Sequence, residues 1–416
     1  MHIVRTFLVL SIVVLTVSVF AAEPLTNETA TTVTREISAT VADIRGLPFR
    51  ESVKVEVVDA DAAARHALER IESFDLMERL NGQEVVFRIL GLIEPETRLL
   101  DLFTDTLREQ VGGFYNPSTK TFYLMDSSSG AMVSILAAHE LTHALEDQHF
   151  DLDSRVRSAI EDDDAAFAVG AVHEGSATLV MTVFAGQALA AGELDLGELQ
   201  EYAQEEAERA VLMRETPPIL TRGLLGAYLL GANFLTNGNV MGVALGGMPH
   251  DRLSAAFDAG PVSSEQVLHP EKYWDPSRKD VPLPVSPRNA GKRLGKGWRR
   301  TLSGVFGELN LGTLVGLGLP TEEAIQSFDA SAWTTPSVQG WGGDRWELWT
   351  HDDGRSVVLL ATRWDSDGDA VEFEAAMNDS RFNVGRRGDL VAIIAGDMPS
   401  SRVRKVLNGM LSGRGR

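Results

Sequence analysis

The order of apolar and polar residues predicts helices mixed with a few strands in the first part of the chain. Residues 35–49 have helical spacing and end at a Gly-Leu-Pro breaker, and residues 52–59 alternate β-branched with polar side chains, as strands do. Helical spacing returns between residues 60 and 110. Residues 112–126 then predict two short strands around an Asn-Pro-Ser-Thr turn, so we expect a small mixed sheet among helices.

Two helices that are apolar on most sides are expected next, and each carries charged residues at unusual places. The first follows serines 127–129, which are good N-cap residues, and includes SILAAHELTHALEDQHFDL at 134–152. The second runs from about residue 163 to Gly192 and contains Glu174 among mostly apolar residues. These polar side chains need a physical reason, because an unpaired charge in an apolar interior is strongly unfavourable.

The rest of the chain predicts a helical stretch and then a separate C-terminal part. Residues 217–248 are apolar and Gly-rich, but Arg222 and three Asn residues within them favour a buried helix pair over a membrane span. From residue 288 to 416 the pattern predicts a hairpin, a helix, a strand and a final helix, which is a small α+β domain. Six of the seven Trp residues lie there; we expect them in the core, with a glycan-binding groove as the alternative.

Length, charge and cysteine content narrow the class of protein. The chain has 416 residues, enough for two domains with cores of their own, which we place at 35–287 and 288–416. The formal net charge of −21 makes nucleic acid and anionic membrane surfaces poor partners. The sequence contains no Cys, which excludes disulfides and a lipoprotein attachment site.

The first residues predict export. Residues 7–20 are apolar apart from Ser and Thr, and Val19 with Ala21 fits the small-residue rule for cleavage after Ala21. The run is shorter than the roughly 20 residues that a spanning helix needs. We therefore expect a signal peptide at 1–22 and a secreted, periplasmic or cell-envelope protein. A retained N-terminal membrane anchor is the alternative.

His139 and His143 give the strongest chemical signal. On a helix they lie about 40° and one turn apart, so both imidazoles can reach one ion. Glu140 lies about 60° from His143, close enough to contact a ligand of that ion without binding it. Zn²⁺ suits such a site, because water bound to it becomes a nucleophile at neutral pH and a carboxylate can take the proton. Coincidental spacing on a polar helix face is the alternative, but the apolar residues 135–138 argue against it.

Glu174 is the candidate for a third protein ligand. A zinc ion held by two histidines needs one more protein ligand, and a buried carboxylate needs a cation nearby. The neighbouring His173 competes for this role, but it lies about 100° away around the helix. An ion pair between Glu174 and an Arg elsewhere in the chain is the alternative.

These motifs resemble the gluzincin branch of the zincin metallopeptidases. The resemblance is carried by HELTHALED and by HEGSAT, which places Glu174 thirty-one residues after His143; the active-site helix is similar to that of thermolysin. It implies a zincin-like domain with a small mixed sheet, an active-site helix and a mostly helical second half. It also implies that His139, His143 and Glu174 bind zinc and that Glu140 is the general base.

The resemblance makes further predictions around these ligands. Asp147, one turn after His143, matches an acid that orients a ligand histidine, and Thr178 occupies the place where members often have an Asp. Zincins pair an extended substrate with an edge strand beside the cleft. The segment expected to form that strand is Thr121, Phe122, Tyr123 and Leu124. The order of motifs over residues 40–275 also resembles uncharacterised bacterial exported proteins.

A peptidase also needs a hydrogen-bond donor for the oxyanion that forms as water attacks. In gluzincins a His or Tyr downstream of the third ligand does this, and the candidates here are His269, Tyr273 and Tyr228. We rank His269 first, because it lies in a loop between Pro261 and Pro270 that can cover a cleft. A turn-capping role for His269 and a core position for Tyr228 are the alternatives.

The sequence therefore predicts an exported zinc peptidase that cleaves peptide bonds in a peptide or protein substrate. Two other functions stay open. A catalytically idle protein that binds peptide or glycan is one, although binding alone does not need the base Glu140. A zinc hydrolase of a non-peptide amide in the cell wall is the other, because the same residues act on any amide carbonyl.

Overall fold

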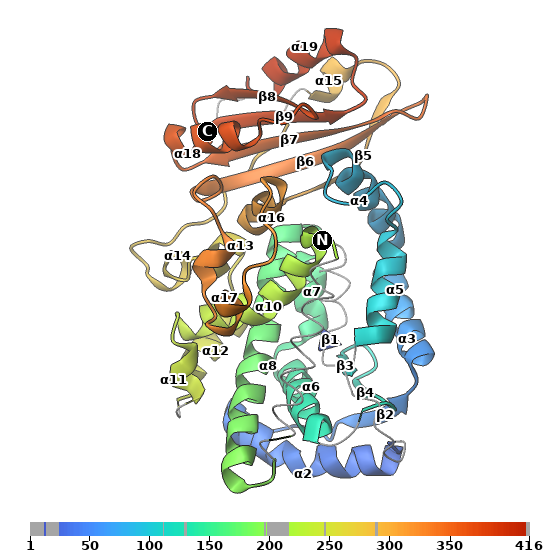
Figure 1. The fold of residues 1–416 in the computed structure, drawn as a ribbon, viewed down its shortest axis with the longest axis vertical. Helices are drawn as coiled ribbons and strands as arrows, with labels where there is room; N and C mark the ends of the chain where they lie inside the picture. The colour runs from blue at the N-terminus through green and yellow to red at the C-terminus, as the bar shows by residue number, and fades with distance from the viewer. Residues whose placement is uncertain are drawn as a thin grey trace.

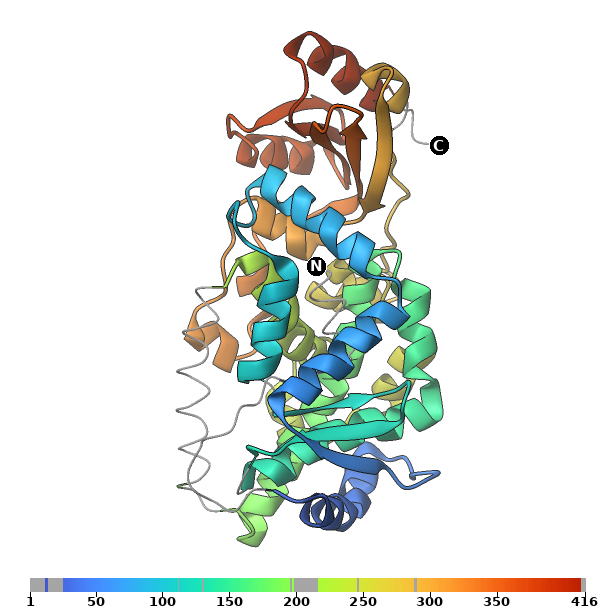
Figure 2. The ribbon, with the colours of Figure 1, turned by 90° about the vertical axis from the view of Figure 1, so that its right-hand side faces the viewer.

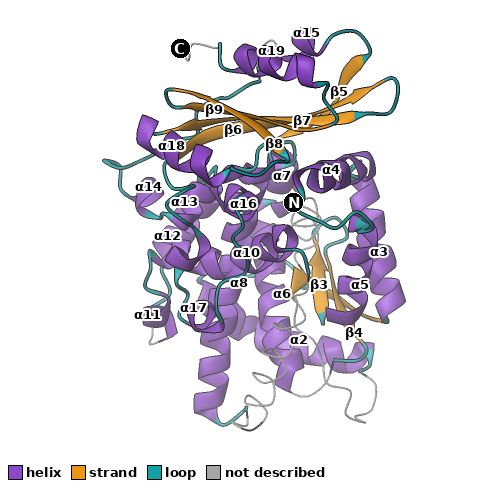
Figure 3. Ribbon diagram, turned by 45° about the horizontal axis from the view of Figure 1, so that its top comes forward, coloured by secondary structure: helices purple, strands orange, loops and turns teal. Residues whose placement is uncertain are grey.

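The structure, a computed structural model, mixes helices and strands, and the α+β expectation is confirmed. A largely helical part that contains a small sheet lies below a five-stranded sheet with its own helices in Figure 1 and Figure 3. The described residues are 12–13, 25–110, 112–128, 131–194, 197, 216–244, 247–287 and 290–412. The predicted signal peptide lies outside them, apart from Ile12–Val13.

The small sheet has the strand order β1-β3-β4-β2. β2 (Lys54–Val58) is parallel to β4 (Thr121–Met125), β4 is antiparallel to β3 (Gly113–Asn116), and β3 pairs on its other side with β1 (Ile12–Val13). The predicted strand at 52–59 and the two strands of the predicted hairpin are confirmed. The prediction that Thr121 to Leu124 forms an edge strand is wrong, because β2 and β3 cover both sides of β4.

Two long helices, α2 (Asn27–Arg45) and α6 (Ala131–Phe150), pack on this sheet. Behind them, α8 (Asp163–Ala191) packs on α6, and α10 (Pro218–Thr236) packs on α8. Figure 1 shows α6 and α8 side by side with α2 beneath them, and α2, α6 and α8 share one buried apolar cluster. α8 and α10 are long and apolar enough to cross a membrane, but 78% of the most apolar window of each is buried inside the structure. Core helices pass the same test, so this is weak evidence for a span.

α8 and α10 approach each other at two glycines. A Cβ on Gly231 would lie 2.0 Å from Ala171 O, and one on Gly175 would lie 2.3 Å from the carbonyl carbon of Gly231. Both distances are far inside van der Waals contact, so only glycine lets the two backbones come this close. Because Gly175 directly follows Glu174, the crossing brings α10 next to the candidate metal ligand.

Shorter helices cover the outside of the first part. α3 and α4 precede α5, which leads into β3, and α7 joins α6 to α8 (Figure 2). Their bounds are α3 (Ala60–Ser73), α4 (Met77–Leu90), α5 (Leu99–Gln110), α7 (Leu152–Ala159), α11 (Val240–Ala244), α12 (His250–Asp258), α13 (Ser264–Leu268) and α14 (Glu271–Trp274).

The C-terminal sheet is antiparallel, in the order β5-β6-β7-β9-β8. Its central strand β7 is buried on both faces. Val357 and Leu359 pack with α15 and α19, whereas Val358 and Leu360 belong to the core of the first part. The elements are α15 (Ala290–Leu294), β5 (Trp298–Gly304), β6 (Trp341–His351), β7 (Ser356–Trp364), α18 (Asp367–Ala376), β8 (Phe382–Arg387), β9 (Leu390–Gly396) and α19 (Ser400–Met410).

The segment between β5 and β6 leaves this sheet and packs on the first part. It forms α16 (Gly307–Leu314), α17 (Glu322–Gln326) and the 3-10 helix η1 (Ala330–Trp333), which lie beside α10 and α13 in Figure 1. The buried Arg222 of α10 donates hydrogen bonds to the carbonyl oxygens of Gly318 and Trp333. The apolar core of the first part therefore continues into the C-terminal part.

The tryptophans of the C-terminal part are mostly core residues, as expected. Four of them have at most 1% of their surface exposed: Trp333, Trp341, Trp346 and Trp364. Trp341 Nε1 donates to Asp344 and Trp364 Nε1 donates to Thr362, so the polar ring atoms of these two are also used internally.

Candidate metal centre

Helix α6 carries several polar side chains in an apolar interior, and three of them form one candidate site. His139, Glu140 and His143 have no exposed surface, and the helix around them packs through residues such as Leu141 and Ala144. The spacing of the two histidines by four residues places both rings on one face of the helix, as predicted. The face looks toward α8, where Glu174 is 4% exposed.

The three predicted metal ligands meet. His139 Nε2 lies 3.1 Å from Glu174 Oε2 and 3.0 Å from His143 Nε2, and His143 Nε2 lies 3.4 Å from Glu174 Oε2. A tetrahedral ion with bonds of about 2.0–2.2 Å separates its ligand atoms by about 3.3–3.6 Å, so the group has nearly the right size. Two imidazole nitrogens and one carboxylate oxygen converge on one point, which is the arrangement that a bound cation needs.

The protonation states in this group suit a divalent cation. Burial lowers the pKa of His139 to about 4, so its imidazole is neutral at pH 7. Burial alone would raise the pKa of Glu174, but the charge of His143 and the hydrogen bonds to both histidines outweigh it and lower the pKa to about 2. A neutral imidazole at His139 and a carboxylate at Glu174 are ligand forms that zinc binds without displacing protons.

His173, the competitor for the third position, turns away from this group. Its ring stacks on Phe257 of α12, with centroids 5.5 Å apart and an interplanar angle of 9°. Burial lowers its pKa to about 3, and the positive charge of His143 adds to the effect. The structure thus places Glu174, and not its neighbour His173, with the other two ligands.

Glu140 lies at the strand β3. Its Oε2 accepts a hydrogen bond of 2.6 Å from the backbone N–H of Tyr115. Tyr115 lies on β3, the strand between β1 and β4, and β3 packs on α6. The hydrogen bond therefore joins Glu140 directly to this strand. Sequence reasoning missed Tyr115, because a backbone contact between a strand and a helix leaves no mark on the residue type.

Tyr228 of α10 also lies at the candidate metal centre. Its ring stacks on His139 with centroids 5.8 Å apart and an interplanar angle of 29°. Burial raises its pKa well above 10, and the negative charges of Glu174 and Glu140 and a hydrogen bond to Glu174 add to the rise. The side chain is therefore a protonated phenol, which can donate a hydrogen bond throughout the ordinary pH range.

The ranking of His269 above Tyr228 as oxyanion donor is not supported by the contacts of the two side chains, because Tyr228 stacks on His139 whereas His269 contacts Glu308. His269 Nε2 lies 3.0 Å from both carboxylate oxygens of Glu308, which also accepts a hydrogen bond from Thr334. The ring therefore joins the loop after α13 to the segment between β5 and β6. Tyr273, the third candidate, donates its hydroxyl proton to Ala259 O.

The predicted role of Asp147 is not supported by its contacts either. Its carboxylate accepts hydrogen bonds from Tyr115 Oη at 2.9 Å and from Leu152 N at 3.0 Å. It therefore fastens β3 and the start of α7 to α6, and does not contact a ligand histidine. Thr178 is buried one turn after Glu174, and its hydroxyl has no hydrogen-bond partner among the described residues.

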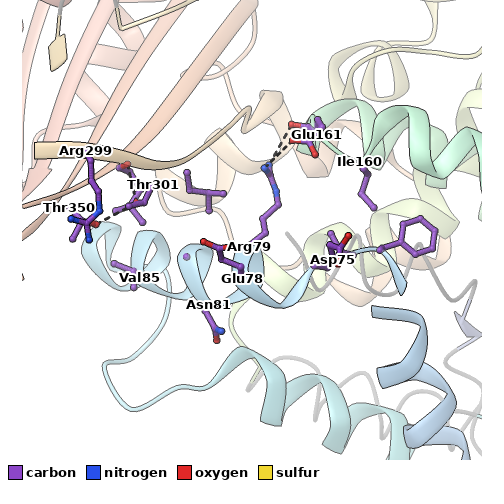
Figure 4. A pocket seen from close by; sticks show the side chains of 15 residues that line it. Asp75, Glu78, Arg79, Asn81, Val85, Ile160, Glu161, Arg299, Thr301 and Thr350 are labelled. Carbon is purple, nitrogen blue, oxygen red and sulfur yellow. Dashed lines mark hydrogen bonds and ion pairs between the residues drawn. The ribbon is translucent and has the colours of Figure 1, made fainter. Parts of the chain in front are cut away.

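A pocket of about 670 Å³ lies elsewhere, between α4 and the strands β5 and β6 (Figure 4). Arg79 crosses it toward Glu161, and Leu302 and Leu348 line the side formed by the sheet. None of the predicted site residues lines this pocket. It is therefore separate from the candidate metal centre.

Comparison with known proteins finds a family match in the C-terminal part of the chain. Residues 293–400 match a family described as a domain of unknown function (DUF8575). No curated protein and no solved structure matches the chain. The matched segment contains the C-terminal sheet and none of the candidate metal ligands.

Proposed function

We propose that the chain is an exported zinc-dependent peptidase of gluzincin type, with a zincin-like fold in its first part. The observation that supports this best is the meeting of His139, His143 and Glu174 beside the carboxylate of Glu140. A zinc ion held there would supply the Lewis acidity that activates water and polarises a carbonyl group. The remaining steps belong to side chains of this protein.

Glu140 is the general base. It takes the proton of the attacking water and later returns it to the leaving amine. The hydrogen bond from Tyr115 N–H orients its carboxylate, so little reorganisation is needed when the proton moves.

Tyr228 is the hydrogen-bond donor for the developing oxyanion. It comes from α10, so it reaches the group of ligands from a different helix than Glu140 and Glu174 do. Its raised pKa keeps the proton on the phenol, and a buried donor aimed at a developing charge stabilises the transition state more than the ground state.

The edge of β3 that faces away from β4 supports an extended peptide as the substrate. One side of β3 pairs with β4, and the other pairs with Ile12–Val13 in antiparallel register at Phe114 and Gly113. A peptide in the same orientation would add a strand at this edge and pass beside Tyr115 and Glu140. Cleavage after Ala21 would remove β1 from the mature protein and open the edge to substrate.

The experiment uses the chain from residue 22 onward. Zinc content is measured first, and unfolded peptides and peptidoglycan fragments are then offered with zinc and with chelator. Peptide cleavage that chelator abolishes and zinc restores supports the proposal. Cleavage of peptidoglycan fragments alone would identify a cell-wall amidase, and zinc-independent binding without cleavage would identify a binding protein; either result contradicts the proposed activity.

A further inference from the structure

A buried hydrogen-bonded bridge joins three helices next to the candidate metal centre. Arg45 is the last residue of α2, Glu146 lies on α6 and Ser176 lies on α8; at most 1% of the surface of each is exposed. Arg45 Nε and Ser176 Oγ each donate to the same oxygen, Glu146 Oε1, at 2.5 Å. One carboxylate oxygen therefore holds α2, α6 and α8 together.

The bridge is adjacent to the metal ligands along both helices. Glu146 follows His143 by three residues on α6, which places the two side chains on neighbouring parts of one helix face. Ser176 follows Glu174 by two residues on α8. A shift at the bridge would therefore change the separation between the histidine pair and the third ligand, and α6 and α8 pack against each other over this region.

The second oxygen of the carboxylate is not used by the bridge. Among the described residues, Glu146 Oε2 and His143 Nδ1 both lack a hydrogen-bond partner although both are buried. Helical side chains lean toward the N-terminus of their helix, so the carboxylate of Glu146 leans toward the turn that carries His143. The bridge therefore acts on the candidate ligands by fixing the positions of α6 and α8, and not through a hydrogen bond to His143.

Arg45 makes a charged carboxylate tolerable at this buried position. Burial raises the pKa of Glu146, and the charge of Arg45 opposes that rise most strongly, followed by the hydrogen bond from Ser176. The guanidinium itself lies over the rings of Phe150 and Phe257, at 5.9 Å and 5.4 Å from their centroids. The cation is thus held by packing as well as by its ion pair.

We propose that Glu146 is the positioning residue of the metal centre, fixing α6, which carries both histidines, against α8, which carries Glu174, through Arg45 and Ser176. This inference rests on the proposed function, since it concerns the same metal site. It assigns to Glu146 a positioning role that the sequence suggested for Asp147. The Asp147 carboxylate is occupied by Tyr115 and Leu152 N.

The test measures metal binding and coordination instead of activity. Apo forms of the wild-type chain, Glu146→Gln and Ser176→Ala are titrated with zinc in competition with a chromogenic chelator. The visible spectrum of each cobalt-loaded form reports the geometry around the ion. Loss of a group that orients a ligand typically weakens metal binding about 10- to 100-fold, so we expect that range for Glu146→Gln and a smaller loss for Ser176→Ala.

Glu265→Gln is the matched control. Glu265 is also a buried carboxylate in an ion pair, with Lys272 Nζ at 2.6 Å, but it lies on α13 and its partners are outside the metal group. This variant should lose stability and keep wild-type zinc affinity and cobalt spectrum. A general effect of destabilisation would instead weaken zinc binding in both variants alike, and that result would overturn the proposal.

The outcomes separate this inference from the proposed function. If the wild-type chain binds one zinc ion and Glu146→Gln binds it equally well with the same cobalt spectrum, the positioning role is wrong and the peptidase proposal stands. If the wild-type chain binds no zinc, both are wrong. Should Glu146→Gln fail to fold, Ser176→Ala decides the question, and an unchanged zinc affinity and cobalt spectrum in that variant would overturn the proposal.

Discussion

Replacement of Tyr228 by Phe removes one hydroxyl and keeps the ring that stacks on His139. Loss of a single oxyanion donor typically lowers kcat by about 10²- to 10³-fold, which is about 2.7–4 kcal/mol of activation free energy. We expect a loss of this size for Tyr228→Phe. The retained ring should keep zinc bound, because packing around His139 does not change.

The pKa of Tyr228 adds a second expectation. Burial and the charges of Glu174 and Glu140 raise that pKa well above 10, so the phenol does not titrate at the pH values at which the enzyme is assayed. The wild-type and Tyr228→Phe pH–rate profiles should therefore differ in height and keep the same shape. A profile that loses one limb in the variant would show that Tyr228 titrates, which contradicts its role as a fixed donor.

The assay compares kcat, KM and zinc content for Tyr228→Phe with Tyr273→Phe as the matched control. Tyr273 loses the same hydroxyl, but its partner is Ala259 O and its ring packs on Phe234 and Trp274. We expect Tyr273→Phe to keep kcat within about a few-fold. If Tyr228→Phe does the same, or loses activity only because zinc is lost, the assignment of the donor is refuted.

Three further predictions follow from the structure. Glu140→Gln should keep zinc and lower kcat by about 10²- to 10⁴-fold, because an amide accepts no proton; turnover near wild type would exclude it as the base. Burial lowers the pKa of His269, but the hydrogen bond to Glu308 and the charge of Glu308 outweigh burial and raise the pKa above 6.5. The stabilisation from this ion pair is therefore complete below about pH 6.5 and is lost as the pH rises through the folded-state pKa. His269→Gln should accordingly lower the Tm more at pH 6 than at pH 9. Gly231→Ala should lower the free energy of unfolding in urea by about 1–3 kcal/mol or more, because its Cβ would meet the backbone of α8, whereas Gly186→Ala, with nothing within 4 Å, should not destabilise.

The candidate ligands on α6 could be predicted because their relative positions depend on one helix alone. His139 and His143 are four residues apart, and helix geometry then fixes their separation without knowledge of the fold. Glu174 could be predicted for a different reason, since a carboxylate in an apolar helix needs a cation. Both arguments use local chemistry, and the structure brings the three residues together.

The proposed donor and the proposed substrate strand could not be predicted, because both depend on contacts between distant segments. Whether Tyr228 or His269 faces the candidate ligands depends on the crossing angle between α10 and α8. The order of residues along α10 does not predict that angle. The strand at 121–124 was expected at the edge because the resemblance places the edge strand there. Its partner on one side, β2, comes from a segment far earlier in the chain. Strand order of this kind is set by tertiary packing and not by the alternation of side chains.

The crossing of α8 and α10 connects the candidate metal ligand Glu174 to the proposed donor Tyr228. Tyr228 precedes Gly231 by three residues and so lies on the same face of α10, while Glu174 directly precedes Gly175 on α8. The contact between the two glycine backbones, where even a methyl group would overlap the neighbouring chain, therefore sets how closely the phenol approaches the carboxylate. A larger residue at either glycine would move Tyr228 away from His139 while α6 still held both histidines, so catalysis would fail before metal binding did.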